Sequence, residues 1–179
     1  LKGLSSTSLD DILTATNSSK GGFYNYFASK DELFLAVLAR AQKIWREKTL
    51  QNLDTIQSPT ARIVKFLNNY KDNYLKDSVQ FPGGCIFITF SVELDDQKPH
   101  LAKEVGAGFI GLKSLLKRII DQAKEIGELN NNANTEIITE VIFTGMIGAS
   151  VLYGMSKSNR ELDKSIQALI DYLEGYRVN

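Results

Sequence analysis

Two short capped segments around a tight turn, between Thr7 and Phe34, restrict the fold of this chain more than any other feature. Ser8 can cap the first segment, because Ser8-Leu9-Asp10-Asp11 has the spacing of a capping box and places carboxylates where backbone N–H groups lack partners. Thr7 with Asp10 offers an alternative cap. An apolar stripe at helical spacing follows, formed by Leu9, Ile12 and Leu13. The sequence therefore predicts a first helix over about residues 8–16.

A second helix is expected after the turn, over about residues 19–26. Asn17 tolerates the left-handed backbone conformation of a tight turn, and Ser18 or Ser19 can cap the helix that follows. The glycine pair at positions 21 and 22 lowers helix propensity but allows the backbone to approach a phosphate group closely. This arrangement is typical of a helix-turn-helix that reads DNA, although capped helices and turns also occur in helical domains that never touch DNA.

Residues 19–34, which read SKGGFYNYFASKDELF, closely resemble the TetR family of transcriptional regulators. The resemblance is sharp over about residues 3–37, and the rest of the chain matches only in its all-helical layout. It implies an all-α fold, in which a helix-turn-helix DNA-binding unit precedes a helical ligand-binding and dimerisation bundle. In such proteins the helix matching residues 19–26 enters the major groove of double-stranded operator DNA, and the residues matching Tyr24 and Lys30 hold phosphates. The candidate DNA-binding residues are Thr7, Ser8, Ser19, Lys20, Gly21, Gly22, Tyr24, Asn25 and Lys30.

The chain departs from the family pattern at three places. Asn17 and Ser18 stand where a glycine and an aliphatic residue are usual, so a small apolar contact beneath the recognition helix is missing. Gly22 replaces a small hydroxylated residue. The first residues, Leu1-Lys2-Gly3, match the end of the family's first helix, so we expect an N-terminal segment to be missing from the sequence.

A net charge of zero, from 21 basic and 21 acidic residues, argues against wide, sequence-independent binding of DNA. Residues 1–48 nevertheless hold seven Lys or Arg against five Asp or Glu, so a modest basic surface, doubled in a dimer, permits phosphate contacts. A single cysteine, Cys85, excludes an internal disulfide and is compatible with a cytoplasmic protein. The longest uncharged run, residues 141–156, is shorter than the roughly 20 residues of a membrane-spanning helix and is expected to be buried.

Helical spacing of apolar residues continues to the end of the chain, with breaks at residues 81–84 and 130–134. A helix over about residues 30–50 continues out of the DNA-binding unit. Further helices are expected after Pro59, over residues 85–94, after Pro99, and over residues 135–157 and 162–176. We therefore divide the chain into a DNA-binding domain, residues 1–48, and a ligand-binding and dimerisation domain, residues 49–179.

The last two helices are candidates for a homodimer interface. The helix over residues 135–157 is apolar on more than one face, and its small residues allow a neighbouring backbone to come close. Packed against their copies, the two helices could form an intermolecular four-helix bundle, with burial inside one subunit as the alternative. The interface candidates are Gly145, Gly148, Ala149, Leu152, Ile166, Leu169, Ile170 and Leu173.

A pocket for a small-molecule inducer is implied inside the C-terminal bundle. Large or soft side chains on the inward faces of different helices are its candidate lining, and plain core packing is the alternative. Glu93 or Tyr70 could supply the polar group that orients a ligand. The candidate pocket residues are Trp45, Phe66, Tyr70, Cys85, Phe87, Phe90, Phe109 and Phe143.

The remaining reactive side chains do not form a catalytic or metal-binding set. His100 is the only histidine and is given no special role. Cys85 is read as a buried inert thiol in preference to a redox sensor beside a helix N-terminus. Glu93, Asp95 and Asp96 are expected to form a solvated acidic face. The sequence therefore predicts no enzyme, no cofactor and no metal.

These observations predict a dimeric, ligand-responsive transcriptional repressor that acts in the cytoplasm and has no membrane partner. In the expected mechanism, ligand moves the helix over residues 85–94, which pushes the helix over residues 30–50 and changes the spacing of the two DNA-binding units. The alternative is a helical small-molecule-binding or interaction protein with a vestigial DNA-reading unit. Zero net charge, Gly22 and the Asn17-Ser18 turn favour that alternative.

Overall fold

The computed structural model describes residues 3–82, 84–94 and 97–178. Over these residues the structure is helical apart from one isolated antiparallel bridge between Leu129 and Arg177, which confirms the predicted all-α fold. The elements in chain order are α1 (Leu9–Thr16), α2 (Lys20–Tyr24), α3 (Lys30–Thr49), α4 (Pro59–Asn69), the π-helix η1 (Tyr70–Leu75), α5 (Ile86–Leu94), α6 (Pro99–Glu125), α7 (Thr135–Ser156) and α8 (Asn159–Glu174).

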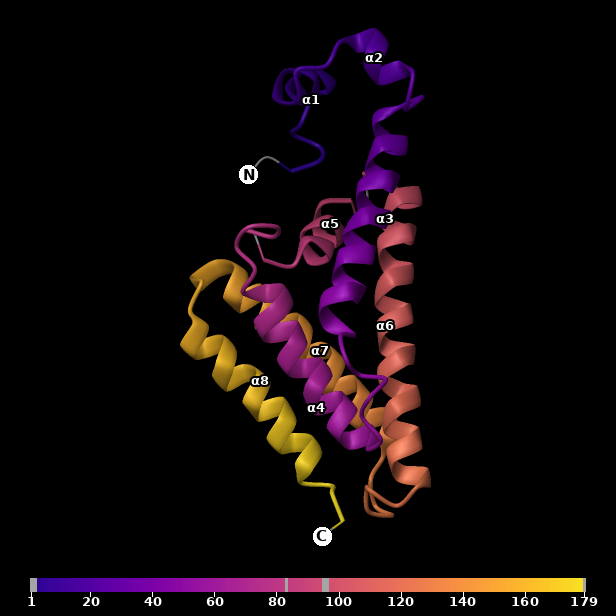
Figure 1. Cartoon of the computed structure of the whole chain (residues 1–179), viewed down its shortest axis with the longest axis vertical. Coiled ribbons are helices and arrows are strands. Elements are labelled where there is room, and N and C mark those ends of the chain that lie inside the picture. The colour runs from indigo at the N-terminus through magenta and orange to yellow at the C-terminus, as the bar shows by residue number, and fades with distance from the viewer. Residues whose placement is uncertain (1–2, 83, 95–96, 179) are drawn as a thin grey trace.

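The molecule is elongated, with α1 and α2 at one end and the C-terminus at the other (Figure 1). Helix α3 starts at the α2 end and runs alongside α6 into the body of the protein. The lower body is a bundle in which α7 packs against α6 and α8, while α4 packs against α6 and α8. Helix α3 is therefore the element that joins the α1–α2 end to the bundle.

Local side-chain caps set most helix boundaries. Ser8 forms the predicted capping box with Asp11, and Asn17 ends α1 in the left-handed conformation with φ of 51°. Helix α2 ends at Tyr24, two residues before the predicted end, because its five residues include two glycines, which favour helix poorly. Helix α8 begins at Asn159, earlier than predicted, because Ser158 caps it by accepting a hydrogen bond from the Glu161 N–H.

The end of α4 departs from regular α-helix in a way that the apolar spacing did not predict. The chain continues directly into η1, so that Phe66, Tyr70 and Tyr74 form a stack, with ring centroids 6.4 Å and 5.7 Å apart. The wider turn alters the register of the side chains that follow it. It places Tyr70 and Tyr74 together in the core beside Cys85.

The apolar side chains are divided between two clusters. The main cluster fills the bundle, and the smaller cluster joins Phe34 and Leu38 of α3 to Leu94 of α5 and to Leu101 and Val105 of α6. This smaller cluster fixes α3 against the start of α6 by burial of apolar surface.

Six of the predicted dimer-interface residues pack within the subunit itself, because α8 turns its apolar face toward α7 and α4. Their place in a dimer interface stays a prediction. A sequence pattern shows that a helix face is apolar but not which surface covers it. The six residues are Gly145, which packs against Leu169, and Ala149, Ile166, Leu169, Ile170 and Leu173. Gly148 and Leu152 lie on the outer face of α7.

Helix α7 is long and apolar enough to cross a membrane, by length and composition alone. The uncharged run counted in the sequence is shorter, but the whole helix has 22 residues, and its most apolar window has a mean hydropathy of 1.6. In the structure α7 packs between α6 and α8, as the core helix of a bundle does, with 39% of that window buried. Its outer face therefore remains uncovered within one subunit.

Two glycine substitutions test the packing of α7. A Cβ at Gly145 would lie 2.5 Å from Cδ2 of the buried Leu169, whereas a Cβ at Gly106 of α6 would meet nothing within 4 Å. We expect Gly145→Ala to lower the free energy of unfolding by about 1 kcal/mol, because overpacking outweighs the gain in helix propensity. Gly106→Ala should raise it by up to about 1 kcal/mol. Urea denaturation measures the free energy of unfolding of both variants. Equal changes of the same sign in the two variants would contradict the packing of Gly145 against Leu169.

Candidate nucleic-acid interface and apolar cavity

Helix α2 forms the exposed tip of the molecule (Figure 1). Ser19 caps it by accepting a hydrogen bond from the Gly22 N–H over 3.0 Å, and buried Phe23 anchors it. The Tyr24 ring lies edge-on to Phe23 and is 50% exposed, and Lys20 is exposed beside it. Gly21 and Asn25 are exposed as well. The structure thus brings most of the predicted DNA-binding side chains of α2 to one accessible end.

Three predicted DNA-binding residues outside α2 also make intramolecular hydrogen bonds through their side chains. The Thr7 hydroxyl donates to the Gly3 carbonyl over 2.7 Å, and the Ser8 hydroxyl takes part in the capping box of α1. The Lys30 ammonium group donates to the carbonyl of Leu4. This bond uses one of the three N–H donors of the Lys30 ammonium group, so two remain for a phosphate contact.

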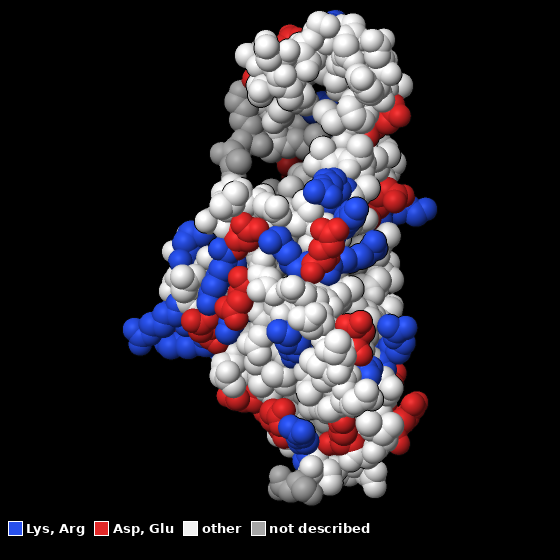
Figure 2. Space-filling model, in the orientation of Figure 1, with Lys and Arg blue, Asp and Glu red and all other residues white. Residues whose placement is uncertain are grey.

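Tyr26 is an accessible aromatic side chain at this end that the sequence analysis did not select. It is 81% exposed, next to the half-buried Phe27, and the only signal in the sequence was its place within the aromatic run of residues 23–27. Figure 2 shows that this end carries few charged side chains, whereas both signs alternate over the bundle. Any phosphate contact there depends on few cations, Lys20 among them.

Two sets of polar contacts tie the α1–α2 end to the body. The Asp31 carboxylate, in the first turn of α3, accepts hydrogen bonds from the Lys98 ammonium group and, if the His100 ring carries a proton there, from its Nε2, 3.0 Å away. The Lys98 hydrogen bond is the largest cause that lowers the pKa of Asp31. Glu93, at the end of α5, accepts a hydrogen bond from the Ser5 N–H. His100 and Glu93 thus take part in contacts that the sequence analysis did not assign to them, and Asp95 and Asp96 lie outside the described residues.

An apolar cavity of about 230 Å³ lies where α3, α5, α6 and α7 meet. It is lined by six of the eight predicted pocket residues, namely Trp45, Tyr70, Cys85, Phe87, Phe109 and Phe143. The other two lie elsewhere. Phe66 packs behind Trp45 in the main cluster, with centroids 6.0 Å apart, and Phe90 packs on Phe34 in the smaller cluster, 4.8 Å away. Gln42 and Arg46 of α3 also line the cavity and were not selected from the sequence.

The inner wall of the cavity holds a small group of buried hydroxyls and a thiol. Ser150 donates to the Met146 carbonyl over 2.8 Å, so the Tyr70 hydroxyl donates to Ser150 Oγ. The Tyr74 hydroxyl donates to Cys85 Sγ over 3.6 Å. Burial raises the pKa of the Cys85 thiol, which keeps it protonated at neutral pH and favours the inert reading over a redox sensor. Glu93 does not line this cavity, whereas Tyr70 does.

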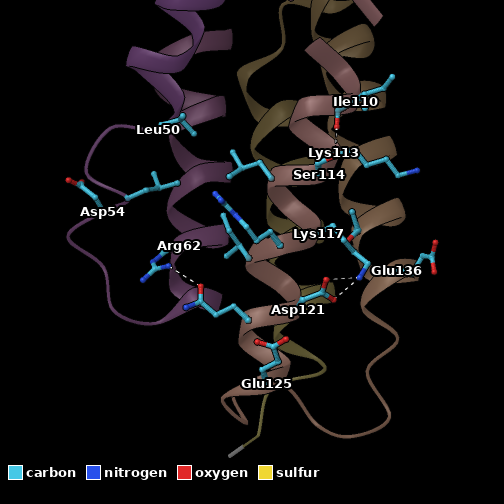
Figure 3. Close-up of a pocket in the computed structure, with 16 residues that line it drawn as sticks. Leu50, Asp54, Arg62, Ile110, Lys113, Ser114, Lys117, Asp121, Glu125 and Glu136 are labelled. Atoms are coloured by element: carbon cyan, nitrogen blue, oxygen red, sulfur yellow. Dashed lines mark hydrogen bonds and ion pairs between the residues drawn. The ribbon is translucent and has the colours of Figure 1, made fainter. Parts of the chain in front are cut away.

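A larger hollow, of about 1190 Å³, lies between α6, the start of α4 and the start of α7 (Figure 3). Within it, Lys117 forms an ion pair with Asp121, and Arg62 donates a hydrogen bond to Gln122. Its lining mixes both signs of charge, so the apolar cavity between α3, α5, α6 and α7 is the stronger candidate for a ligand. Over the described residues, no group of three or more His, Cys, Asp or Glu is arranged to hold a metal ion.

Comparison with known proteins identifies the chain from both halves. Residues 1–37 match the family described as bacterial regulatory proteins of the tetR family, and residues 59–169 match the tetracyclin repressor-like C-terminal domain. The chain belongs to the TetR family. The resemblance seen in residues 19–34 is therefore confirmed. The predicted division at residues 48 and 49 falls between the two matched regions and stays a prediction.

Individual similar proteins agree with this assignment. An uncharacterised HTH-type transcriptional regulator encoded in the lacX 3′ region of Lactococcus lactis subsp. lactis is 33% identical over 125 residues, which is 64% of this chain and 64% of that protein. The HTH-type transcriptional repressor DhaR of Mycobacterium sp. strain GP1 is 22% identical and covers 96% of this chain and 84% of DhaR. A TetR regulator from Chloroflexus aurantiacus has a TM-score of 0.89 at 25% identity, over 100% of this chain and 90% of that one.

The Asp31 contact gives a pH-dependent prediction for this TetR protein. Because the pKa of Asp31 is lowered in the folded state, its contribution to stability is present above the unfolded value of about 3.9 and is lost as pH falls through the folded value. We expect Asp31→Asn to reduce the free energy of unfolding at pH 7 by about 0.5–1 kcal/mol, as for a partly exposed ion pair.

Thermal unfolding of wild type and Asp31→Asn, compared between pH 7 and pH 3, measures this effect. The difference between the two proteins should shrink in acid. Glu47→Gln is the control, because it removes an exposed ion pair with Lys43 within α3 alone and should cost only about 0.3–0.5 kcal/mol. A difference for Asp31→Asn that persists unchanged at pH 3 would contradict the role of the carboxylate.

Proposed function

We propose that this TetR-family protein is a homodimeric transcriptional repressor that binds a two-fold operator with α2 of each subunit and leaves it when a small molecule fills the apolar cavity. The observation that carries the proposal is the exposed tip formed by α2, with Lys20, Tyr24 and Asn25 accessible beside a buried Phe23 anchor. Side chains of these types hold phosphates and base edges. Two such helices should stand about 34–36 Å apart, or a multiple of that spacing, to meet successive major grooves.

Exposed apolar side chains on the outer face of α7 support the proposal of a dimer. Leu152 is 59% exposed and Met155 is 80% exposed, and they continue a stripe at helical spacing with Ile137, Gly148 and Val151. Exposed apolar side chains grouped on one helix face are typical of a surface that a partner covers. A second copy is the partner that fits, because a two-fold axis lets the same stripe meet itself. The contact surface proposed from the structure is therefore this α7 stripe, with Gly148 and Leu152 retained from the sequence prediction.

The cavity and the α3–α6 contact share residues, which supports a ligand-responsive mechanism. Val105 lines the cavity and also belongs to the smaller cluster with Phe34 and Leu38. Phe87 and Phe109 line the cavity and pack against the same cluster. A ligand that displaces these side chains would move α5 and α6 against α3 and change the spacing of the two α2 helices. Linked sites of this kind typically show coupling of about 1–3 kcal/mol.

We further propose that the protein acts in the cytoplasm and carries out no catalysis. The matched family is one of bacterial regulatory proteins, and neither operator binding nor ligand binding requires a catalytic step. A ligand-binding protein with a vestigial DNA-reading unit is the alternative. It is favoured by the engagement of Lys30 with Leu4 and by the few charges at the tip.

The DNA-binding proposal is tested with Lys20→Ala and Tyr24→Ala. Fluorescence anisotropy with duplexes from the region immediately upstream of the gene for this protein measures affinity over a range of salt concentrations. Both variants should bind more weakly, and Lys20→Ala should reduce the slope of log affinity against log salt by about 0.9 for each phosphate contact removed.

Lys65→Ala is the matched control. The substitution removes the same charge as Lys20→Ala, but Lys65 lies on α4 in the bundle. It should leave both affinity and slope unchanged. Unaltered binding by Lys20→Ala and Tyr24→Ala would remove α2 as the recognition helix. Binding to these duplexes no tighter than to random DNA would lead to a genome-wide operator search, and failure of that search would favour the ligand-binding alternative.

The dimer proposal predicts that Leu152→Glu shifts the protein toward a monomer, because the substitution places a charge in the centre of the proposed apolar contact. Light scattering at micromolar concentration measures the mass. Val92→Glu is the control, since Val92 is 77% exposed on α5 and is not part of the α7 stripe. A wild-type monomer, or dimers in both variants, would count against this surface.

A further inference from the structure

We propose that the cavity selects a small molecule with an apolar, single-ring body and one anionic group, a carboxylate, which Arg46 and Gln42 hold at the mouth. This inference rests on the proposed ligand-responsive function and names the class of ligand. It follows from the distribution of charge, free space and hydrogen-bonding capacity around the cavity.

Arg46 is the charged residue of the lining. All other described residues around the cavity are neutral, so no carboxylate there can balance a positive ligand. Among the described residues, none forms an ion pair or hydrogen bond with the Arg46 guanidinium group. An unpaired guanidinium at the edge of an apolar cavity favours an anion and disfavours a cation.

Gln42 extends this positive edge. It lies one helical turn before Arg46 on α3, so the two side chains are neighbours on the same face. The Gln42 side chain makes no hydrogen bond to a described residue, and its Nε2 would lie 3.7 Å from a Cβ placed on Gly108 of α6. An amide N–H and a planar guanidinium together can donate to both oxygens of one carboxylate.

The interior of the cavity is suited to a ring rather than to a charge. The rings of Trp45, Phe87, Phe109 and Phe143 line it. On the inner wall the Tyr70 hydroxyl donates its proton to Ser150, so it has no free proton for an anion. Burial keeps the Cys85 thiol neutral, so it offers no charge and only a weak S–H donor. An anionic group therefore stays at the mouth, and the apolar body points inward.

Glycines in α6 leave the space that this body occupies. Gly108 and Gly111 lie in the interior of a long helix, where glycine is unfavourable, and both line the cavity. A Cβ at Gly111 would meet nothing within 4 Å, so packing within the protein does not require a glycine there. The volume of about 230 Å³ lies below the roughly 300–1,000 Å³ of pockets for drug-sized ligands, which limits the ligand to about one ring with a short chain.

The test uses Trp45, the one tryptophan of the sequence, as a fluorescent reporter within the cavity. DNA-free protein is titrated at pH 7 with three probes of the same shape, namely 4-phenylbutanoate, 4-phenylbutanamide and 4-phenylbutan-1-amine. We expect the carboxylate to bind about fivefold more tightly than the neutral amide, as for a charge pair at a partly exposed site, and the ammonium probe to bind most weakly.

Matched variants assign the preference to the named residues. Arg46→Gln should abolish the preference for carboxylate over amide, whereas Arg40→Gln removes the same charge from α3 outside the cavity and should preserve it. Gly111→Leu should abolish binding of the carboxylate and amide probes by filling the cavity. Gly106→Leu on the same helix, where a Cβ also meets nothing within 4 Å and which does not line the cavity, should retain it.

The ligand class is overturned by equal binding of the three probes, by a carboxylate preference that survives in Arg46→Gln, or by absence of saturable quenching with the carboxylate. Operator binding on the same preparation separates this result from the proposed function. Operator binding without a carboxylate preference would overturn the ligand class alone. A carboxylate preference that depends on Arg46, without operator binding, would support the ligand class and overturn the repressor.

Discussion

The contact between the first half of α3 and the start of α6 determines where the DNA-binding tip stands relative to the bundle. Phe34 and Leu38 are buried there against Leu101 and Val105. Because α3 is one continuous helix of 20 residues, about 30 Å long, a small rotation at this contact becomes a larger displacement at α2. The Asp31 contacts at the same crossing are partly exposed and individually weak. Apolar packing therefore sets the position of α3, and the polar contacts restrict its rotation.

This contact is not independent of the cavity, because both use the same part of α6. Val105 faces Phe34 and Leu38 in the smaller cluster and also lines the cavity. A densely packed protein interior transmits the displacement of a side chain to its neighbours, since few voids can absorb it. The cavity is the exception, and it lies where a ligand can reach the residues that hold α3. The glycines Gly108 and Gly111 cost helix stability, and in the proposed mechanism the space beside them is the site from which a ligand would change the position of α3.

The sequence predicted the features that depend on neighbouring residues and missed those that depend on distant ones. Ser8, Asp11 and Asn17 determine the ends of α1 through contacts within a few residues, so their roles could be read directly. The π-helix η1 could not be predicted from the sequence, because a regular α-helix would place the same tyrosines at a similar spacing. Phe90 has the same chemical character as Phe87, but only the packing of α5 decides that Phe90 contacts Phe34 instead of the cavity. In the sequence Gln42 and Arg46 have the pattern of an ordinary polar helix face, and only the packing of α6 and α7 against α3 places them at a cavity.

Helix α7 shows why an apolar helix could not be assigned to one surface from its sequence. Gly145 and Gly148 lie one turn apart, yet Gly145 packs against Leu169 in the subunit itself while Gly148 lies on the outer face. Phe143 and Met146 of the same helix line the cavity. One helix thus contacts the cavity, the core and the surface proposed to meet a second subunit. In a dimer formed through that surface, the α7 helices of the two subunits would pack against each other. A ligand that displaced Phe143 or Met146 would move α7, and α7 would transmit that movement directly to the partner subunit. The two α2 helices would then change their spacing together, which is the geometry that a two-fold operator detects.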